Sequence, residues 1–462
     1  MPSFSGKFRY PNRDGSGVQA GPCQVTFDAD TFTLTPSSNA PLAFDLGDID
    51  LLVPAEHELT LTLYTGKKLV LHQFGKAFQN LAHDLLEAYR QRLVQCLLLE
   101  DLEEIARFDG FVELRSAVAP QRSFSSSAEL RLYKSNLAVL PTQATAFQWR
   151  WAEVDAVAFD EATYTVTLPS GTDSLVVTKL AKRTHEFRER VEAGITEIAE
   201  KAAQALRQLF PFLTPEQFQQ AATLMKEGQA APLARLQAVH PKLEMALFQN
   251  VVDATLRPYF DALLAHTTAG GVYTGFKFIR EEEEENGEAT VEQSSEAAEA
   301  GEQGPQEPQE QAASEVTARI VREGRESILH WFFFPLATRA GASRPGNLVA
   351  WEATSRGGRA TYFFRLVPPE QAKLLEDVPR ADAVRDAAIR QLNRALTLLN
   401  FRREPIYLSD DELEMQPRYR RYAIACRKIP ELRRLRASFL GRAIHTSPPS
   451  WRTQLESFLA RG

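Results

Sequence analysis

The feature that most constrains this chain is an internal repeat whose two copies lie about 105 residues apart. The first copy is clearest in residues 46–93 and the second in residues 151–195. Pairs that match at an offset of 105 are Pro36 and Pro141, Asp48 and Glu153, Ile49 and Val154, Asp50 and Asp155, Leu63 and Leu168, and Gly66 and Gly171. Pairs that match at 106 are Leu69 and Leu175, Leu71 and Val177, and Leu81 and Phe187. Solenoid units are only about 20 to 50 residues long, whereas this repeat is the size of a small domain. The chain therefore contains two copies of one domain.

Within each copy the apolar residues change their period from two to three or four. Residues 59–63 and 164–168 alternate between apolar and polar, which predicts half-buried strands. The glycine that follows lies in a short polar turn, YTGKK or PSGTD, which is typical of a β-hairpin. Apolar residues then recur at spacings of three and four over residues 78–93 and 187–202. Each copy is expected to end in an amphipathic helix that covers its sheet.

Several antiparallel strands followed by one closing helix resemble the pleckstrin-homology-like (PH-like) superfold, in which the helix plugs one end of a curled, barrel-like sheet. The resemblance covers about residues 6–100 and 108–208, and it rests on the order and pattern of the elements. It implies ligand binding by loops or sheet edges, and the superfold as such fixes no particular ligand. The two closing helices contain no tryptophan, a residue common in that helix of pleckstrin-homology domains proper. A Greek-key barrel or another α+β sheet would explain the same pattern.

The length of 462 residues fits about three domains, and 44% apolar with 24% charged residues is an ordinary globular composition. We predict an α+β fold. Its parts are PH-like modules at residues 1–105 and 106–210, a helical segment at 211–268, and an α+β C-terminal region at 269–462 with a disordered acidic insertion at 281–315. No apolar run is long enough for a membrane span, and the N-terminus has no apolar signal region. The three widely spaced cysteines, Cys23, Cys96 and Cys426, suit buried thiols in a reducing compartment, so we expect a cytoplasmic protein.

The formal net charge of −7 is divided unevenly along the chain. Residues 281–315 contain 13 Glu and no Lys or Arg, whereas residues 316–462 contain 26 Lys and Arg against 15 Asp and Glu. The acidic segment has no aromatic residue and is rich in Gln, Ala, Ser and Pro, so it is expected to be disordered. It acts either as a passive spacer or as a mask over the basic region that follows.

Two helix starts and four strands can be placed after the second module. Thr214 with Gln217, and Ser409 with Glu412, each form the capping-box pattern of a helix N-terminus. Apolar runs predict strands at residues 271–279, 327–337, 347–354 and 360–367. The acidic segment would then be an insertion within one antiparallel sheet, which costs little because loop-closure entropy grows slowly with length.

The last helices are strongly basic and amphipathic. Apolar residues such as Tyr422 and Leu432 are interleaved with arginines, and Pro430 marks a break. Clustered guanidinium groups can neutralise phosphates, although a solvated charged face explains the same pattern. The candidate polyanion-binding residues are Arg418, Arg420, Arg421, Arg427, Lys428, Arg433, Arg434 and Arg436.

Local motifs for catalysis, cofactors or metals do not occur in the sequence. The eight histidines have no zinc-site spacing, and neither a phosphate-binding loop nor a nucleophile elbow is found, so we predict no catalytic, cofactor-binding or metal residues. Glu352 in AWEATSR has some likeness to the acidic strand of metal-dependent nucleases, but Thr354 replaces the partner lysine.

The sequence favours a non-enzymatic interaction or scaffold protein that binds a protein partner through its tandem modules. One alternative is a nucleic-acid-associated protein that uses the basic C-terminal helices, masked by the acidic segment. Another is an enzyme whose active-site residues are distant in sequence. A phosphoinositide or membrane-surface ligand is disfavoured, because the first module has few basic residues near its first strands, among them Lys7, Arg9 and Arg13.

Overall fold

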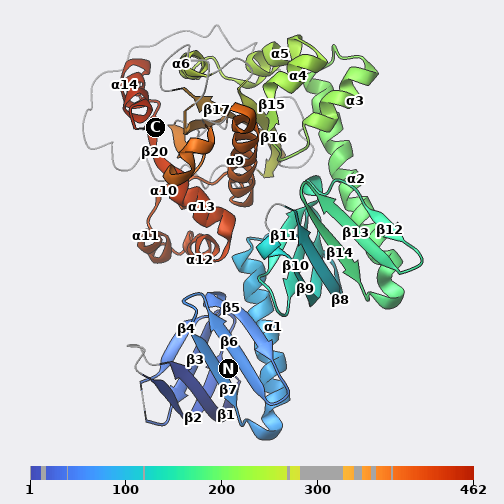
Figure 1. Ribbon diagram of the computed structural model, residues 1–462, viewed down its shortest axis with the longest axis vertical. Coiled ribbons are helices and arrows are strands. Elements are labelled where there is room, and N and C mark those ends of the chain that lie inside the picture. The colour runs from blue at the N-terminus through green and yellow to red at the C-terminus, as the bar shows by residue number, and fades with distance from the viewer. Residues whose placement is uncertain are drawn as a thin grey trace, which may run out of the picture. The chain divides into compact units, whose positions relative to one another are not determined.

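The computed structural model describes residues 2–11, 17–38, 40–117, 120–267, 271–280, 326–337, 346–354, 360–375 and 378–461. The chain divides into two compact units (Figure 1). The first comprises Met1–Ile198 and Ser409–Arg433, and the second comprises Ala199–Leu408 and Arg434–Gly462. The predicted disordered insertion at residues 281–315 lies outside the described residues. The first unit thus combines the N-terminal part of the chain with a segment that lies more than 200 residues further on.

The first module of this unit is a curled, seven-stranded antiparallel sheet followed by a helix (Figure 1). The strands are β1 (Ser3–Pro11), β2 (Val18–Phe27), β3 (Thr31–Pro36), β4 (Leu42–Asp45), β5 (Ile49–Pro54), β6 (Glu58–Leu63) and β7 (Lys68–His72). They are ordered β4-β3-β2-β1-β7-β6-β5. A short 3-10 helix, η1 (Leu46–Asp48), precedes β5, and the closing helix is α1 (Phe78–Cys96). The apolar positions of β6 are buried, as the alternation predicted.

The second module repeats this topology. Its strands are β8 (Glu104–Ser116), β9 (Phe124–Tyr133), β10 (Asn136–Pro141), β11 (Phe147–Arg150), β12 (Ala158–Asp160), β13 (Thr165–Ser170) and β14 (Asp173–Thr178), and the order is β11-β10-β9-β8-β14-β13-β12. The 3-10 helix η4 (Trp151–Glu153) corresponds to η1, and α2 (Thr184–Leu209) corresponds to α1. The expected tandem duplication of a strand-rich, helix-closed module is confirmed.

Matched residues of the repeat occupy matching places. Leu81 on α1 and Phe187 on α2 are both fully buried. Ile49 and Val154 are also both buried directly after their 3-10 helices, but only Ile49 lies within a strand. The repeat would place Val154, like Ile49, in a strand, and this expectation is wrong because β12 begins only at Ala158. Gly66 and Gly171 both have positive φ in their hairpin turns, which a glycine adopts without strain.

Helix α1 joins the two modules. Arg90 makes an ion pair of 3.0 Å with Glu129 on β9, and the neighbouring Arg131 donates to Gln91 of α1. The side chain of Gln148 on β11 donates to the carbonyl of Leu97, just after α1. Glu129 and Arg131 are almost completely buried and pair with each other. Because a half-satisfied buried charge is costly, this network favours one fixed arrangement of the two modules.

The second unit is a six-stranded antiparallel sheet with helices on both faces (Figure 1). Its strands, in sheet order, are β15 (Ala231–Pro232), β16 (Tyr273–Arg280), β17 (Glu326–Leu336), β18 (Leu348–Ala353), β19 (Ala360–Arg365) and β20 (Phe439–Ile444). Its helices include α3 (Pro215–Leu224), α4 (Leu233–Val239), α5 (Lys242–Val251), α6 (Arg257–His266), α9 (Val378–Leu398), α10 (Glu404–Tyr407) and α14 (Pro448–Leu459). The four predicted strands are therefore present, and β16 and β17 pair across the inserted segment.

Two further expectations concern helix starts and cysteines. The capping box of Thr214 and Gln217 is formed at the start of α3. All three cysteines are free and buried. In the described part of the chain, we find no helix that is long and apolar enough to cross a membrane.

Candidate interaction site on the first module

The segment Ser409–Arg433 contains two short helices, α11 (Asp410–Met415) and α12 (Arg420–Lys428), and the start of α13 (Pro430–Ser438). Helix α11 begins with the predicted capping box, in which Ser409 and Glu412 bond reciprocally. Three acidic residues in its first turn suit the positive end of the helix dipole. Helix α12 ends at Lys428 because Pro430 cannot supply the N–H that another turn would need. The start of α11 and the end of α12 are thus both set by the local sequence.

The apolar face of α12 packs on η1 and on the C-terminal half of α1. Ile424 and Cys426 are buried, as are the small side chains of Ala423 and Ala425. The approach is closest at Gly47, where an added Cβ would lie 2.7 Å from Cγ2 of Ile424 and 2.8 Å from Sγ of Cys96. Only glycine therefore fits at this position while Ile424 stays in place.

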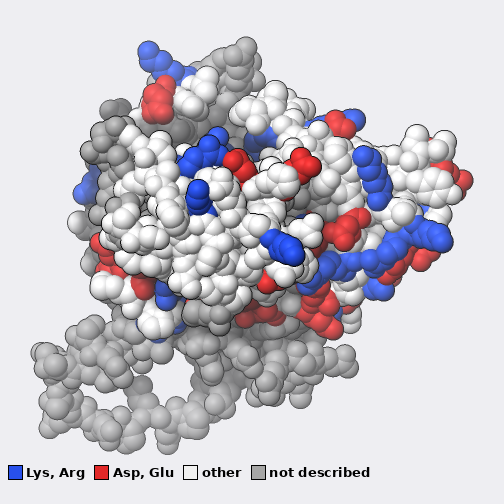
Figure 2. Space-filling model, turned by 90° about the horizontal axis from the view of Figure 1, so that it is seen from below, with Lys and Arg blue, Asp and Glu red and all other residues white. Residues whose placement is uncertain are grey.

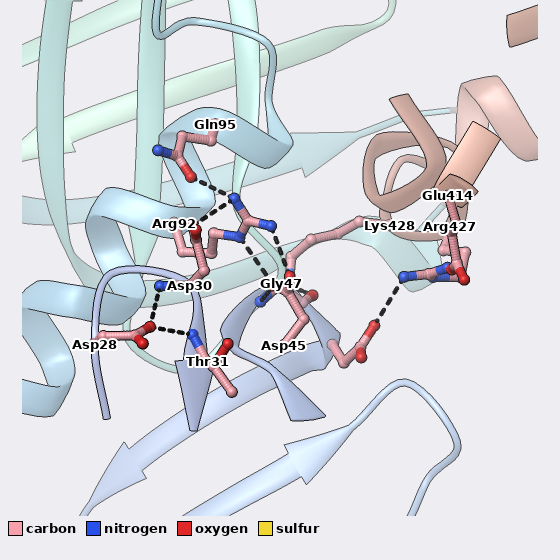
Figure 3. A network of polar contacts seen from close by, with 11 residues as sticks. Asp28, Asp30, Thr31, Asp45, Gly47, Arg92, Gln95, Glu414, Arg427 and Lys428 are labelled. Carbon is pink, nitrogen blue, oxygen red and sulfur yellow. Dashed lines mark hydrogen bonds and ion pairs between the residues drawn. The ribbon is translucent and has the colours of Figure 1, made fainter. Parts of the chain in front are cut away.

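Lys428 is the most deeply buried charge of the segment. Its side chain lies over η1, where the ammonium donates to the carbonyl oxygens of Gly47 and Ile49 (Figure 3). It also lies 5.5 Å from the centre of the Tyr89 ring. Burial lowers the pKa of Lys428, and nearby acidic groups oppose this only in part. The lysine thus makes specific hydrogen bonds but is costly to desolvate.

Arg421 and Arg427 pair with acidic residues of the first module. Arg421 contacts Glu100 and Asp101, each at 2.7 Å. Burial would lower the pKa of Arg421, but Tyr422 and the bonds to these two carboxylates outweigh burial and raise it. The guanidinium is therefore charged at every physiological pH. Its partners are an adjacent pair that directly follows α1.

Arg427 lies between Asp48 of η1, at 3.3 Å, and Glu414 of α11 (Figure 3). Burial raises the pKa of Asp48 more than Arg427 lowers it. This is the expected balance for a carboxylate that has lost much of its water and has gained a single arginine. The contact fixes α11, α12 and η1 together through one guanidinium group.

The receiving surface is itself held in place by Arg92 of α1 (Figure 3). Arg92 makes two hydrogen bonds to Asp45, of 2.9 and 2.6 Å, and an ion pair of 3.0 Å with Asp30. Asp45 in turn accepts from the backbone N–H of Gly47 and so caps η1. A bidentate arginine–carboxylate pair is rigid in direction, so η1 is also held by contacts within its own module.

The eight predicted polyanion-binding residues are therefore not one free cluster. Arg421, Arg427 and Lys428 are brought together against the first module. Arg433 donates to the carbonyl of Arg427, and Arg418 stacks on Tyr419. Arg434 and Arg436 belong to the second unit, where they donate to Gln391 and to the carbonyl of Pro405. Arg420 is exposed.

Sequence reasoning missed the acceptors of this site, which are Gly47, Asp48, Glu100 and Asp101. Each lies more than 300 residues from its partner on α12, so no local spacing connects them. One available signal was the match of Asp48 with Glu153, which marks the position but not its role.

A second polar cluster lies inside the second unit, around Glu352, whose partners the sequence did not indicate. Glu352 on β18 is fully buried, with His445 at 3.1 Å and the hydroxyl of Thr361 donating to the same oxygen. The indole N–H of Trp451 on α14 donates to Thr361 at 2.8 Å, and Tyr259 of α6 stacks on His445. Through Trp451 and Tyr259 this cluster connects α14 and α6 to the sheet. The Glu352 carboxylate at its centre is closed to solvent.

No group of three or more potential metal ligands is found among the described residues. Comparison with models of known protein families finds none that matches, and comparison with curated proteins finds no significantly similar sequence.

Proposed function

We propose that this chain is a non-enzymatic interaction protein whose two PH-like modules form one rigid platform for binding protein segments. The carrying observation is that the first module already holds a helix from a distant part of the chain. Helix α12 is received by the apolar contact at Gly47 and by acidic groups on both sides of it. A module that recognises a helix through shape and charge has the properties of a protein-binding domain.

The assignment to the PH-like superfold rests on topology. Seven antiparallel strands in the order 4-3-2-1-7-6-5, followed by one closing helix, occur twice. This order places the first strand between the two halves of the sheet, so that the sheet can curl around the helix. The fold alone does not select a ligand, and the proposed ligand class comes from the site on the first module.

The platform requires that the two modules keep a fixed arrangement. The buried network of Arg90, Glu129 and Arg131 supports this requirement, since α1 belongs to the first module and the two β9 residues belong to the second. Two surfaces held at one spacing can bind two segments of a partner at high effective concentration.

The test uses the intact chain, immobilised and exposed to an extract of its source cells. Retained proteins are identified, purified separately and titrated into the chain by calorimetry. We expect at least one saturable complex of fixed stoichiometry. If no retained protein binds the purified chain in solution, the interaction proposal is wrong.

Some of the arginines on which the nucleic-acid alternative rests are still available at the surface. Arg418, Arg420, Arg433 and Arg434 are exposed. On the face of the molecule seen in Figure 2, however, basic side chains lie beside acidic ones. Three of the eight candidate residues also have partners on the first module that a polyanion would have to replace. Direct binding to a polyanion is therefore the weaker proposal. Its test is to measure the affinity for a polyanion at several salt concentrations.

A further inference from the structure

We infer that the surface around η1 is a receptor for a basic amphipathic helix of a partner protein, and that α12 occupies this receptor as an internal ligand. The inference rests on the proposed function and specifies its partner. The receptor surface consists of Gly47, Asp48, Glu100 and Asp101, together with the carbonyl of Ile49.

The contacts define the chemistry of the ligand. Arg421, Ile424 and Arg427 are spaced by three residues, so they lie along one face of the helix. Arg421 reaches the acidic pair after α1, Ile424 meets Gly47, and Arg427 reaches Asp48. A partner helix that carries arginine, a β-branched residue and arginine at this spacing would make the same three contacts.

Part of what holds the receptor surface in place does not come from α12. Asp45 caps η1 and Arg92 holds Asp45, and neither residue is part of α12. Asp30 adds a second acidic contact to Arg92 from the β2–β3 turn. A surface held by its own module can exchange one helix for another, because the Arg92–Asp45 contacts remain when the helix leaves.

Several contacts of α12 are weak or costly, which makes it a replaceable ligand. The ion pairs of Arg421 and Arg427 involve side chains that are 19% to 61% exposed, so solvent and salt screen them. Lys428 buries an ammonium group against two neutral carbonyls, which is unfavourable compared with an apolar side chain of similar volume. A partner helix with methionine at this position would avoid that cost. In favour of α12 are its buried apolar face and its tether at both ends, which keeps it always near the receptor.

The experiment uses the full-length chain and a fluorescent peptide of residues 409–433 that carries Lys428→Met. The host is the variant Arg421→Glu with Arg427→Glu, in which like charges oppose the receptor and release α12. The matched control is Arg420→Glu with Arg434→Glu, which makes the same change in net charge at two exposed arginines outside the receptor contacts. Binding is followed by fluorescence anisotropy, and folding by circular dichroism and light scattering.

We call the variant Arg421→Glu with Arg427→Glu the released variant. We expect the peptide to bind it about 100-fold more tightly than the wild-type or control chain, because the tethered helix no longer competes. Adding Asp48→Lys to the released variant should weaken this binding, and a peptide that also carries Arg427→Asp should restore part of it. Such a charge exchange identifies the contact itself.

Two results would overturn the inference. One is a folded, released variant that does not bind the peptide. The other is a released variant that unfolds, because a replaceable ligand can leave without loss of the module. In both cases α12 is a fixed part of the first unit. The proposed interaction function would survive either result, since it fails only if the intact chain has no protein partner.

Discussion

At Gly47 the packing of α12 leaves no room for one added carbon atom. Changing Gly47 to Ala adds a Cβ that overlaps both Ile424 and Cys96. Such overpacking typically costs about 1–3 kcal/mol. We expect the free energy of unfolding of the first unit to fall by this amount in denaturant titrations.

The control for Gly47→Ala is Gly21→Ala, because an added Cβ at Gly21 meets nothing within 4 Å. The double variant Gly47→Ala with Ile424→Ala should lose less stability than the two single variants together, since the smaller partner relieves the overlap. Additive losses would show that the two residues are not in contact.

The burial of Lys428 should make the free energy of unfolding depend on pH in the alkaline range. Burial lowers its pKa, whereas the unfolded chain keeps the ordinary value of about 10.5. Between these two values the unfolded state binds more protons, so the free energy of unfolding rises as the pH rises through this window. Below the window, the cost of burying the ammonium is fully present.

The comparison is with Lys428→Met, which has no charge to lose at this position. Denaturant titrations of both chains from about pH 7 to about pH 10.5 should show a gain for the wild type relative to the variant. Other titrating groups are common to both chains and largely cancel. Parallel curves would mean that Lys428 does not change its protonation in this range.

At the scale of elements, the features that the sequence predicts well are local ones. A capping box joins Thr214 to Gln217 and another joins Ser409 to Glu412, so each signal lies within one helical turn. The hairpin glycines Gly66 and Gly171 are marked by the turn itself. The internal repeat extends this reach, because each copy supports the reading of the other.

Contacts between distant elements were not predictable from spacing. The ion pair between Asp48 and Arg427 and the pair between Glu352 and His445 depend on how strands and helices pack. Glu352 shows the reason most clearly. Strand alternation places it on a covered face, but only the position of β20 brings His445 to it. A charge in an apolar run indicates a buried partner without saying which residue it is.

Helix α2 provides a test of the closing-helix assignment. Phe187 is fully buried, and its ring is edge-on to Phe108 of β8, with 5.3 Å between the ring centres. Changing Phe187 to Ala removes these contacts and leaves a cavity, so the free energy of unfolding should fall by about 3–5 kcal/mol. Phe212→Ala serves as the control, because Phe212 is 39% exposed. Equal losses in both variants would contradict a core role for Phe187.

At the scale of the whole molecule, the distribution of charge makes the polyanion alternative testable. Deleting residues 281–315 removes 13 negative charges and changes the formal net charge from −7 to +6. A positive chain attracts polyanions over a distance that shrinks with salt, to about 8 Å at physiological ionic strength. We therefore expect the deletion variant to bind heparin or DNA more tightly than the intact chain at low salt, and its affinity to fall more steeply as salt is raised. Replacing the 13 glutamates with glutamine keeps the length and should act like the deletion.

If the intact chain and the deletion variant bind equally, the segment is a passive spacer. If neither binds, the exposed arginines are a solvated face and the nucleic-acid alternative is lost.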